Sequence, residues 1–248
     1  MQTQSARPVA LVTGAARRIG AQIARTLHAA GYDLALHGRH SFAELEALSA
    51  ELETARRNST IALHADLADP DSLPELIDAA LARFSRLDAL VNNASQFYAT
   101  PLETASVAQW DELLAVNARA PFFLARAAAP ALRETQGAIV NITDIYAQRP
   151  LGEHALYDIS KAALLMATKV LALELGPQVR VNAVAPGNVL WSTNPIKAET
   201  EQTVIERTTL RRQGTPQDIA NAVLFLLRDA GYCSGIVLPV DGGRLLHI

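Results

Sequence analysis

The sequence predicts an α/β protein, a single domain built on a doubly wound parallel sheet with helices on both faces. Its 248 residues suit one large α/β domain better than two small ones. Short apolar runs alternate with longer helical segments along the whole chain. The apolar runs show no polar alternation, which is expected of strands that are covered on both faces. We therefore take residues 1–248 as one domain.

Each element follows from a local pattern. The strands are expected in short apolar runs, at residues 9–12, 33–37, 60–64, 89–91, 138–142, 179–184 and 236–240. Helices are expected at residues 19–30, 43–57, within 66–84, and at 108–131, 157–175 and 216–227. Gly31 and Gly176 end two of these helices, and Asp69 or Asp71 is placed to cap the third. Pro121 predicts a bend in the helix at 108–131.

Composition and charge restrict the class of protein. Half of the residues are hydrophobic, so a sizeable core is possible. The net charge of −3 gives no electrostatic reason to expect a nucleic acid partner. The single cysteine excludes an internal disulfide and a metal site built from cysteines. The chain starts without an apolar signal region and has no apolar run of membrane-spanning length, which predicts a cytoplasmic protein without a membrane partner.

Ligands of a doubly wound sheet bind at the carboxyl ends of its strands, so the residues that follow strands are the candidates. The turn after the first strand contains Gly14 and Gly20, which allow a tight turn and close approach of the backbone to a pyrophosphate. A plain strand-to-helix turn is the alternative. The predicted contacts here are Gly14, Arg17, Arg18, Ile19 and Gly20.

The turn after the second strand discriminates between dinucleotides. Many NAD-binding folds carry an acid there, which holds the ribose 2′-hydroxyl. This chain has His37, Arg39, His40 and Ser41 instead. Because Arg and His attract a 2′-phosphate, we expect NADP(H) rather than NAD(H), with a solvated basic turn as the alternative.

Three later turns complete the predicted cofactor edge. Asp66 and Leu67 follow the third strand, on the adenine side. Asn93, Ala94 and Ser95 follow the fourth, near the ribose. Pro186 and Gly187 follow the sixth and shape the nicotinamide side.

The reactive groups are predicted at the start of the helix at 157–175. Tyr157 and Lys161 stand four residues apart, on one helix face. An ammonium beside a phenol lowers the phenol pKa, which makes Tyr157 a usable proton donor near neutral pH. Asp144 lies thirteen residues upstream and is expected beside the same pocket. The alternatives are a solvated helix face for the pair and a helix cap or surface acid for Asp144.

Asn117 is a poor helix former inside a predicted helix. It is either a buried structural amide or a kink that holds water or Lys161.

The order and spacing of these pieces resemble the short-chain dehydrogenase/reductase family over nearly the whole chain. The residues that carry the resemblance are Thr13-Gly14 with Gly20, Asp66, Asn92-Asn93-Ala94, Asn117, Tyr157 with Lys161, Pro186-Gly187 and Val240-Asp241-Gly242-Gly243. It implies a Rossmann-type fold, with Tyr157 as the proton donor and Lys161 holding the nicotinamide ribose. It also implies that Asn117 supports a water-linked proton path and that the protein is a homotetramer built through helix pairs.

Two departures from the general family pattern are similar to pteridine reductases, including the bacterial dihydromonapterin/dihydrofolate reductase group. Arg18 stands where the family has a second glycine, and Asp144 stands where it has a serine. The stretch 92–101 is similar as well. The resemblance implies that Arg18 faces the cofactor phosphate and the substrate, and that Ser95 bonds the cofactor or a pterin. It implies that Phe97 sandwiches the pterin against the nicotinamide.

The turn at residues 37–41 also resembles that group. His37 and Ser41 match its 2′-phosphate turn, with Arg39 and His40 in exchanged order, so the side chain that contacts the phosphate stays open.

The chemistry of these side chains suits a pterin. A carboxylate at Asp144 can accept two hydrogen bonds from the ring edge, and an aromatic face at Phe97 adds stacking. Core packing is the alternative for Phe97. The predicted reaction is therefore NADPH-dependent hydride transfer to a dihydropterin, and to an oxidised pterin or a folate as further candidates. The predicted substrate contacts are Arg18, Ser95, Phe97, Asp144, Tyr157 and Trp191.

Residues 188–212 are expected to form a substrate-covering loop, in which Trp191 lines the pocket or belongs to a surface flap. Three other functions stay open: a short-chain reductase for a ketone or 3-oxoacyl substrate, a non-catalytic NADP(H)-sensing protein, and a structural or interaction protein.

Overall fold

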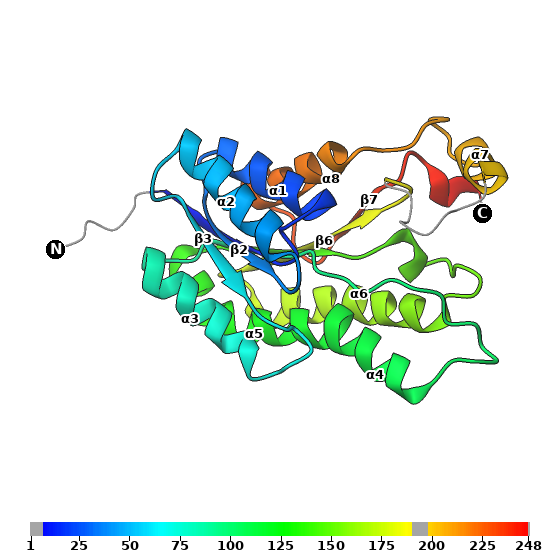
Figure 1. Ribbon diagram of the computed structural model, residues 1–248, viewed down its shortest axis with the longest axis horizontal. Coiled ribbons are helices and arrows are strands. Elements are labelled where there is room, and N and C mark those ends of the chain that lie inside the picture. Colours follow the sequence, from blue (N-terminus) through cyan, green and yellow to red (C-terminus); the bar gives the residue numbers. More distant parts are fainter. Residues whose placement is uncertain (1–6, 190–197, 248) are drawn as a thin grey trace.

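The computed structural model describes residues 7–189 and 198–247. Its centre is a seven-stranded sheet of order β3-β2-β1-β4-β5-β6-β7, in which all neighbours run parallel (Figure 1). The strands are β1 (Val9–Val12), β2 (Asp33–Gly38), β3 (Thr60–His64), β4 (Ala89–Asn92), β5 (Ala138–Ile142), β6 (Arg180–Pro186) and β7 (Val237–Val240). The predicted fold class is confirmed.

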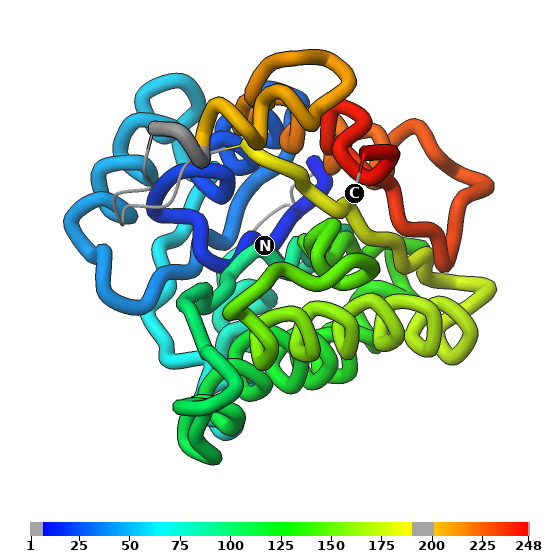
Figure 2. The backbone as a smooth tube through the Cα atoms, turned by 90° about the vertical axis from the view of Figure 1, so that its right-hand side faces the viewer, coloured from blue at the N-terminus to red at the C-terminus, as the bar shows by residue number. Residues whose placement is uncertain are grey.

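Helices cover both faces of the sheet, as the blue and orange segments on one side and the green segments on the other show (Figure 2). One layer contains α1 (Arg18–Ala29), α2 (Phe42–Ala55) and α8 (Pro216–Leu224). The other contains α3 (Ser72–Phe84), α4 (Val107–Leu114), α5 (Ala120–Thr135) and α6 (Ala155–Leu175). Two apolar clusters fill the layers, because strand residues alternate between the two faces: Val12 joins the first cluster and Leu11 the second.

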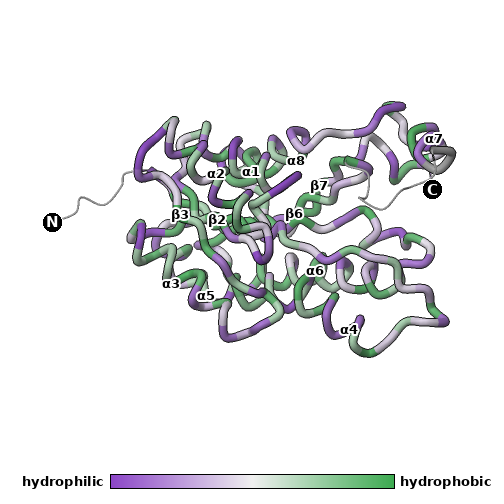
Figure 3. Tube along the Cα trace, viewed as in Figure 1, coloured by the Kyte–Doolittle hydropathy of each residue, from purple (hydrophilic) through white to green (hydrophobic). Residues whose placement is uncertain are grey.

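The sheet order places the site. The chain builds outward from β1 to β3, then returns to β4 on the other side of β1. The carboxyl ends of β1 and β4 therefore flank the point where the strand order reverses, and this is where open α/β sheets bind their ligands. The central strands are hydrophobic and the helices are mixed in hydropathy, as expected for amphipathic cover (Figure 3).

The long helical region before β5 departs from the prediction. A π-helical turn, η1 (Ala115–Arg119), separates α4 from α5 and contains Asn117. Pro121 was predicted to bend this region, and it lies two residues after η1 in a helix that continues from α4 through η1 into α5. It has no N–H to donate to the Asn117 carbonyl oxygen, so the regular helical bonding is interrupted there. Asp71 precedes α3 without capping it, and Asp69 accepts the Asp71 N–H instead, so the predicted cap is wrong.

Other differences lie in the C-terminal third. α8 ends at Leu224, earlier than predicted, and continues as the π-helical η3 (Phe225–Asp229). The region predicted as a loop at 188–212 contains the helix α7 (Ala198–Glu206). Two short 3-10 turns, η2 (Ile145–Ala147) and η4 (Arg244–His247), were not predicted. Of the helices in the part of the chain that the structure describes, none is long and apolar enough to cross a bilayer.

Candidate active site

The first turn is fixed by side chains from both neighbouring strands. The Thr13 hydroxyl oxygen accepts the N–H groups of Asn93 and Ala94, at 3.0 and 3.1 Å. The Asn93 amide donates in return to the carbonyl oxygens of Thr13 and Gly14, at 2.9 and 3.1 Å. The Asn93 side chain, predicted to contact a cofactor, therefore holds the turn that lies beside it.

Glycines are required in this turn. Gly14 has φ +64°, and a Cβ at Gly20 would lie 2.0 Å from the Gly14 carbonyl oxygen. No side chain fits at such a distance, so α1 packs directly on the turn. At Gly187 a Cβ would lie 2.7 Å from the Asp241 Cα, so β6 and β7 also end in close contact.

The start of α1 suits an anion. Arg17, its N-cap residue, makes no side-chain capping bond, and the N–H groups in the first turn of a helix favour a bound anion. Arg17 and Arg18 are exposed beside them. Arg18 has φ +53°, a left-handed backbone that a side chain adopts at a cost. The donors, the cations and the glycine turn together fit the pyrophosphate of a dinucleotide, and Ile19 lies partly buried at the same edge.

His37 does not have its predicted role. Its ring is buried, its Nε2 lies 3.1 Å from the Ala65 carbonyl oxygen, and its Nδ1 accepts the Gly14 N–H at 3.4 Å. Burial lowers the pKa of His37, so the ring is neutral near pH 7. A neutral ring with both nitrogens in use cannot bind a phosphate, and it links the glycine turn to the end of β3 instead.

Arg39 carries the positive charge of the second turn. Its guanidinium lies 2.9 Å from the Asp66 carboxylate, and both side chains are partly exposed. This ion pair places Arg39 beside Asp66, which follows β3 at the carboxyl edge of the sheet, on the side predicted for the adenine. His40 is exposed and Ser41 precedes α2. Leu67, a predicted adenine contact, is buried in the apolar core, so its side chain is not available to a cofactor.

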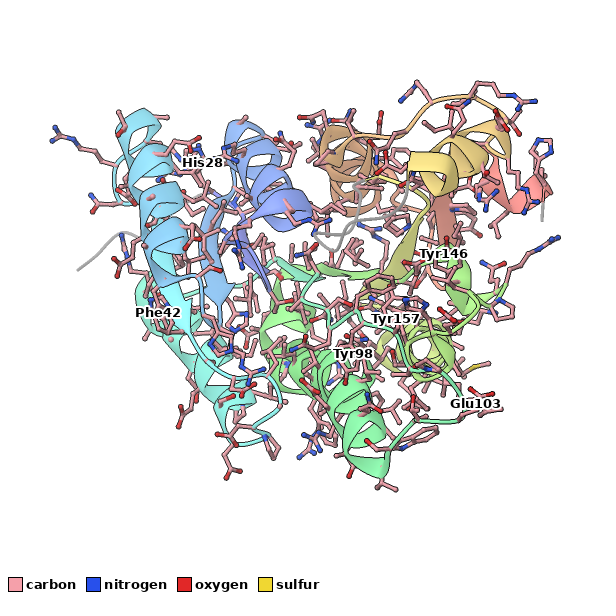
Figure 4. The ribbon with its side chains drawn as sticks, turned by 45° about the vertical axis from the view of Figure 1, so that its right-hand side comes forward. His28, Phe42, Tyr98, Glu103, Tyr146 and Tyr157 are labelled. Carbon is pink, nitrogen blue, oxygen red and sulfur yellow. The ribbon has the colours of Figure 1, made fainter. Side chains whose placement is uncertain are left out.

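Tyr157 and Asp144 form the centre of the site. The Tyr157 hydroxyl donates to Asp144 Oδ2 at 2.8 Å, while Asp144 Oδ1 accepts the Tyr146 N–H at 3.0 Å (Tyr146 and Tyr157 are labelled in Figure 4). Asp144 is thus both the cap of η2 and the partner of the tyrosine. The two interpretations offered for Asp144 are not exclusive.

The electrostatics of this pair differ from the prediction. Burial raises the pKa of Asp144 to about 6 and lowers the pKa of Lys161 to about 8. Burial and the Asp144 charge hold the pKa of Tyr157 well above its ordinary value. Lys161 donates to the Ile142 carbonyl oxygen at 2.9 Å, with its Nζ 5.8 Å from the centre of the Tyr157 ring. The predicted lowering of the Tyr157 pKa by Lys161 is therefore wrong for this structure.

The Asn117 side chain has no free hydrogen-bonding group. Its Nδ2 donates to the Gln96 carbonyl oxygen and the Ser160 hydroxyl, both at 2.9 Å. Its Oδ1 accepts the Gln96 N–H at 2.8 Å and the Ser95 hydroxyl at 3.2 Å. The side chain is thus a structural amide within a kinked helix, and the predicted contact with Lys161 is absent.

The segment 95–100 presents Phe97 to the pocket. Residues 95, 97 and 99 are exposed, whereas 96, 98 and 100 are partly or fully buried, as in an extended strand. The Phe97 ring is 45% exposed, so core packing does not explain it. Its centre lies 4.7 Å from that of Tyr157, nearly perpendicular, and 4.9 Å from that of His154, nearly parallel.

The structure thus brings Asp144, Tyr157, Lys161 and Phe97 together, with Ser95 on the same segment. Pro186 is buried at the end of β6. Trp191 lies outside the described residues, within the undescribed part of the predicted covering loop at 190–197. The sequence analysis did not single out His154 or Thr100. The sequence carried no signal for Thr100, because residues 95–100 alternate in burial but not in polarity.

Comparisons with known proteins agree with this geometry. A family model described as enoyl-(acyl carrier protein) reductase matches residues 14–244. A putative ketoacyl reductase of granaticin polyketide synthesis from Streptomyces violaceoruber is 39% identical, with 96% of each chain covered. Pteridine reductase 1 from Leishmania tarentolae is 36% identical, with 99% of each covered.

A solved structure is also similar over nearly the whole chain. It is a blue fluorescent protein from a metagenomic library in complex with NADPH, with a TM-score of 0.90 and 36% identity, covering 96% of this chain and 97% of that one. The fold, the glycine turn and the tyrosine–lysine pair define an oxidoreductase with a dinucleotide cofactor. The chain belongs to the short-chain dehydrogenase/reductase family.

Proposed function

We propose that this protein reduces a pterin, converting a dihydropterin to a tetrahydropterin with NADPH. The observation that carries the proposal is the carboxylate of Asp144 bonded to Tyr157 beside the exposed ring of Phe97. A flat heterocycle with N–H groups along its edge needs an acceptor and an aromatic surface, and this pocket has both. Similarity to a pteridine reductase supports the proposal, and a ketoacyl reductase is similar to the same extent.

The cofactor edge consists of the glycine turn, Arg17, Arg18 and Arg39, with Lys161 placed to hold the nicotinamide ribose. When bound, NADPH supplies the hydride that adds to the carbon of a C=N bond. The ring nitrogen then needs a proton. Tyr157 stays protonated near neutral pH, because its pKa is raised.

Asp144 replaces the proton that leaves Tyr157. With a pKa of about 6, it exchanges protons with water near neutral pH, which a carboxyl of ordinary pKa does poorly. Tyr157 gives its proton to the ring nitrogen and takes one from protonated Asp144 across their 2.8 Å bond. Lys161 keeps a positive charge nearby, which limits the rise in the Asp144 pKa.

Arg18 and Ser95 complete the proposed pocket. Arg18 faces substrate and phosphate, and Ser95 bonds the ring edge. The second candidate function, reduction of a 3-oxoacyl thioester, is favoured by the ketoacyl reductase relatives. A serine at position 144 would donate to such a carbonyl oxygen, whereas Asp144, with a pKa of about 6, is mainly ionised at pH 7 and in that form only accepts.

The test is the substitution Asp144→Ser. We expect loss of pterin turnover by about a hundredfold or more, the scale of a lost acid–base group. NADPH binding, followed by fluorescence titration, should stay within about twofold, because Asp144 lies at the substrate side. Full pterin turnover by Asp144→Ser would contradict the proposed role. A gain of acetoacetyl thioester reduction would show that position 144 selects between the two substrates.

A further inference from the structure

Segment 95–100, the wall of the proposed pocket that carries Phe97, is held in place at three alternate residues. Gln96 is bonded through its main chain to Asn117. The Tyr98 hydroxyl donates to the Glu112 carboxylate at 2.9 Å, at the surface. The third fastening is Thr100, which is completely buried. These anchors leave the side chain of Phe97, between the first two, on the exposed side.

Thr100 contacts the segment that leads into α6. Its N–H donates to the Glu153 carbonyl oxygen at 2.6 Å, and it pairs with His154 in an isolated parallel bridge. Its hydroxyl accepts the Leu156 N–H at 3.2 Å. Leu156 is the second residue of α6, where helix N–H groups have no partner within the helix.

The cap of α6 is therefore supplied from a distant loop. His154, the N-cap residue, makes no side-chain capping bond, and its Nδ1 lies 2.8 Å from the Gly152 carbonyl oxygen instead. Tyr157 follows Leu156 directly. One buried hydroxyl thus joins the segment that carries Phe97 to the helical turn that carries Tyr157.

We propose that Thr100 is a positioning residue of the substrate pocket, which sets the placement of Phe97 and His154 relative to Tyr157. This inference rests on the proposed function, because the binding of a stacked flat ring depends on where Phe97 lies relative to Tyr157. Without the hydroxyl, the partly buried Leu156 N–H loses its partner, and the Thr100 N–H bond to the Glu153 carbonyl oxygen holds the two segments without it, so their spacing shifts. The substrate ring then meets a displaced wall, while the cofactor edge on β1, β2 and β4 is unchanged.

The experiment compares Thr100→Val with Thr100→Ser and with Tyr98→Phe. Valine keeps the shape and removes the acceptor, serine keeps the acceptor, and Tyr98→Phe removes the exposed fastening of the same segment. For dihydrobiopterin we expect Thr100→Val to raise KM about tenfold, which corresponds to one lost buried hydrogen bond. Thr100→Ser should restore KM to within about threefold, and Tyr98→Phe should leave it unchanged. The Kd of NADPH should stay within about twofold in all three.

If Thr100 only stabilises the fold, Thr100→Val should lower the apparent kcat, because less of the protein is folded, and should leave KM unchanged. The Tm of the variant is measured to detect this loss of stability. An unchanged KM with a lowered Tm would overturn the proposal. A Thr100→Ser variant as impaired as Thr100→Val would overturn it too. Failure of the proposed function is recognised separately, because the unmodified protein would then not reduce dihydrobiopterin. In that case the KM of Thr100→Val for acetoacetyl thioester is measured, and an unchanged value overturns the positioning role.

Discussion

At the residue scale, Arg18 combines a backbone cost with a useful charge. Its φ of +53° lies in the region where glycine is favoured, and the family resemblance places a glycine there. An arginine in this conformation is retained where its guanidinium is needed, beside the uncapped start of α1. Stability and binding should therefore respond in opposite directions at this position.

We expect Arg18→Gly to keep or raise the free energy of unfolding, by up to about 1 kcal/mol, while raising KM for NADPH and pterin about fivefold or more. Thermal denaturation and steady-state kinetics measure the two effects. Gln136→Gly is the control, because Gln136 has φ +52° between α5 and the amino end of β5, at the opposite end of that strand from Asp144. That variant should gain stability with unchanged KM. Unchanged KM in Arg18→Gly would contradict the role of the guanidinium.

The Asp144 pKa predicts a pH dependence. Burial raises that pKa to about 6, so the fraction of protonated Asp144 falls as the pH rises through 6. If protonated Asp144 resupplies Tyr157, kcat for pterin falls about tenfold per pH unit above this value. A pH–rate profile from pH 5 to 8 should show this fall in kcat, and the profile of Asp144→Asn should not. A wild-type profile that is flat across pH 6 would exclude Asp144 as the proton source.

At the element scale, α8 ends in the π-helical turn η3, and the end of this turn is stabilised from outside the helix. Arg180 on β6 donates to the carbonyl oxygens of Leu226 and Ala230 through Nη1, at 2.7 and 3.0 Å. Its Nη2 donates to that of Leu227 at 2.8 Å. One guanidinium therefore takes up the carbonyl groups that η3 leaves unpaired.

Arg180→Met should lower the free energy of unfolding by about 2–3 kcal/mol, a fall in Tm of roughly 5–10 °C, because these carbonyl groups lose a charged donor. Thermal denaturation followed by circular dichroism measures it. Arg228→Met, which removes an exposed pair with Asp229, should leave Tm unchanged. Equal Tm values for both variants would show that Arg180 does not stabilise the end of η3.

The strands and most helices could be predicted because their patterns are local. Apolar runs gave the strands to within a residue or two, and Gly31 ended α1 as expected. The sequence indicated an irregularity near Asn117 and Pro121 but not that it is a π-helical turn, because the Asn117 side chain is held by Gln96 and Ser160 from other segments. His37 was misjudged for a similar reason: its burial depends on Ala65, from a different strand end.

Within the site, the spacing of Tyr157 and Lys161 predicted their shared helix face, but it could not predict their pKa values, which depend on burial. A buried carboxylate at 2.8 Å from the phenol outweighs an ammonium that is bonded elsewhere. No sequence pattern states which partner a buried lysine takes.

At the scale of the whole molecule, α6 carries an apolar stripe. Ile159, Met166, Val170 and Leu173 are all more than 40% exposed and are spaced seven, four and three residues apart, so they share one helix face. Exposed apolar faces of this kind mark association surfaces. We propose that this stripe pairs with the same helix of a second copy, within the homotetramer that the family resemblance implies.

Val170→Glu should reduce the molar mass in solution, measured by light scattering during size exclusion, from four times the chain mass to two or one times. A charge in the centre of an apolar interface is desolvated without a partner. Ala82→Glu, on the exposed side of α3, should leave the mass unchanged. An unchanged mass for Val170→Glu would place the interface elsewhere.

The central claim is the substrate, and one measurement tests it most directly. NADPH oxidation by the purified protein is followed by absorbance with dihydrobiopterin, dihydromonapterin and dihydrofolate, beside an acetoacetyl thioester. We predict turnover with at least one dihydropterin and none with the thioester. Turnover with the thioester alone would contradict the pterin assignment, while leaving membership of the family intact.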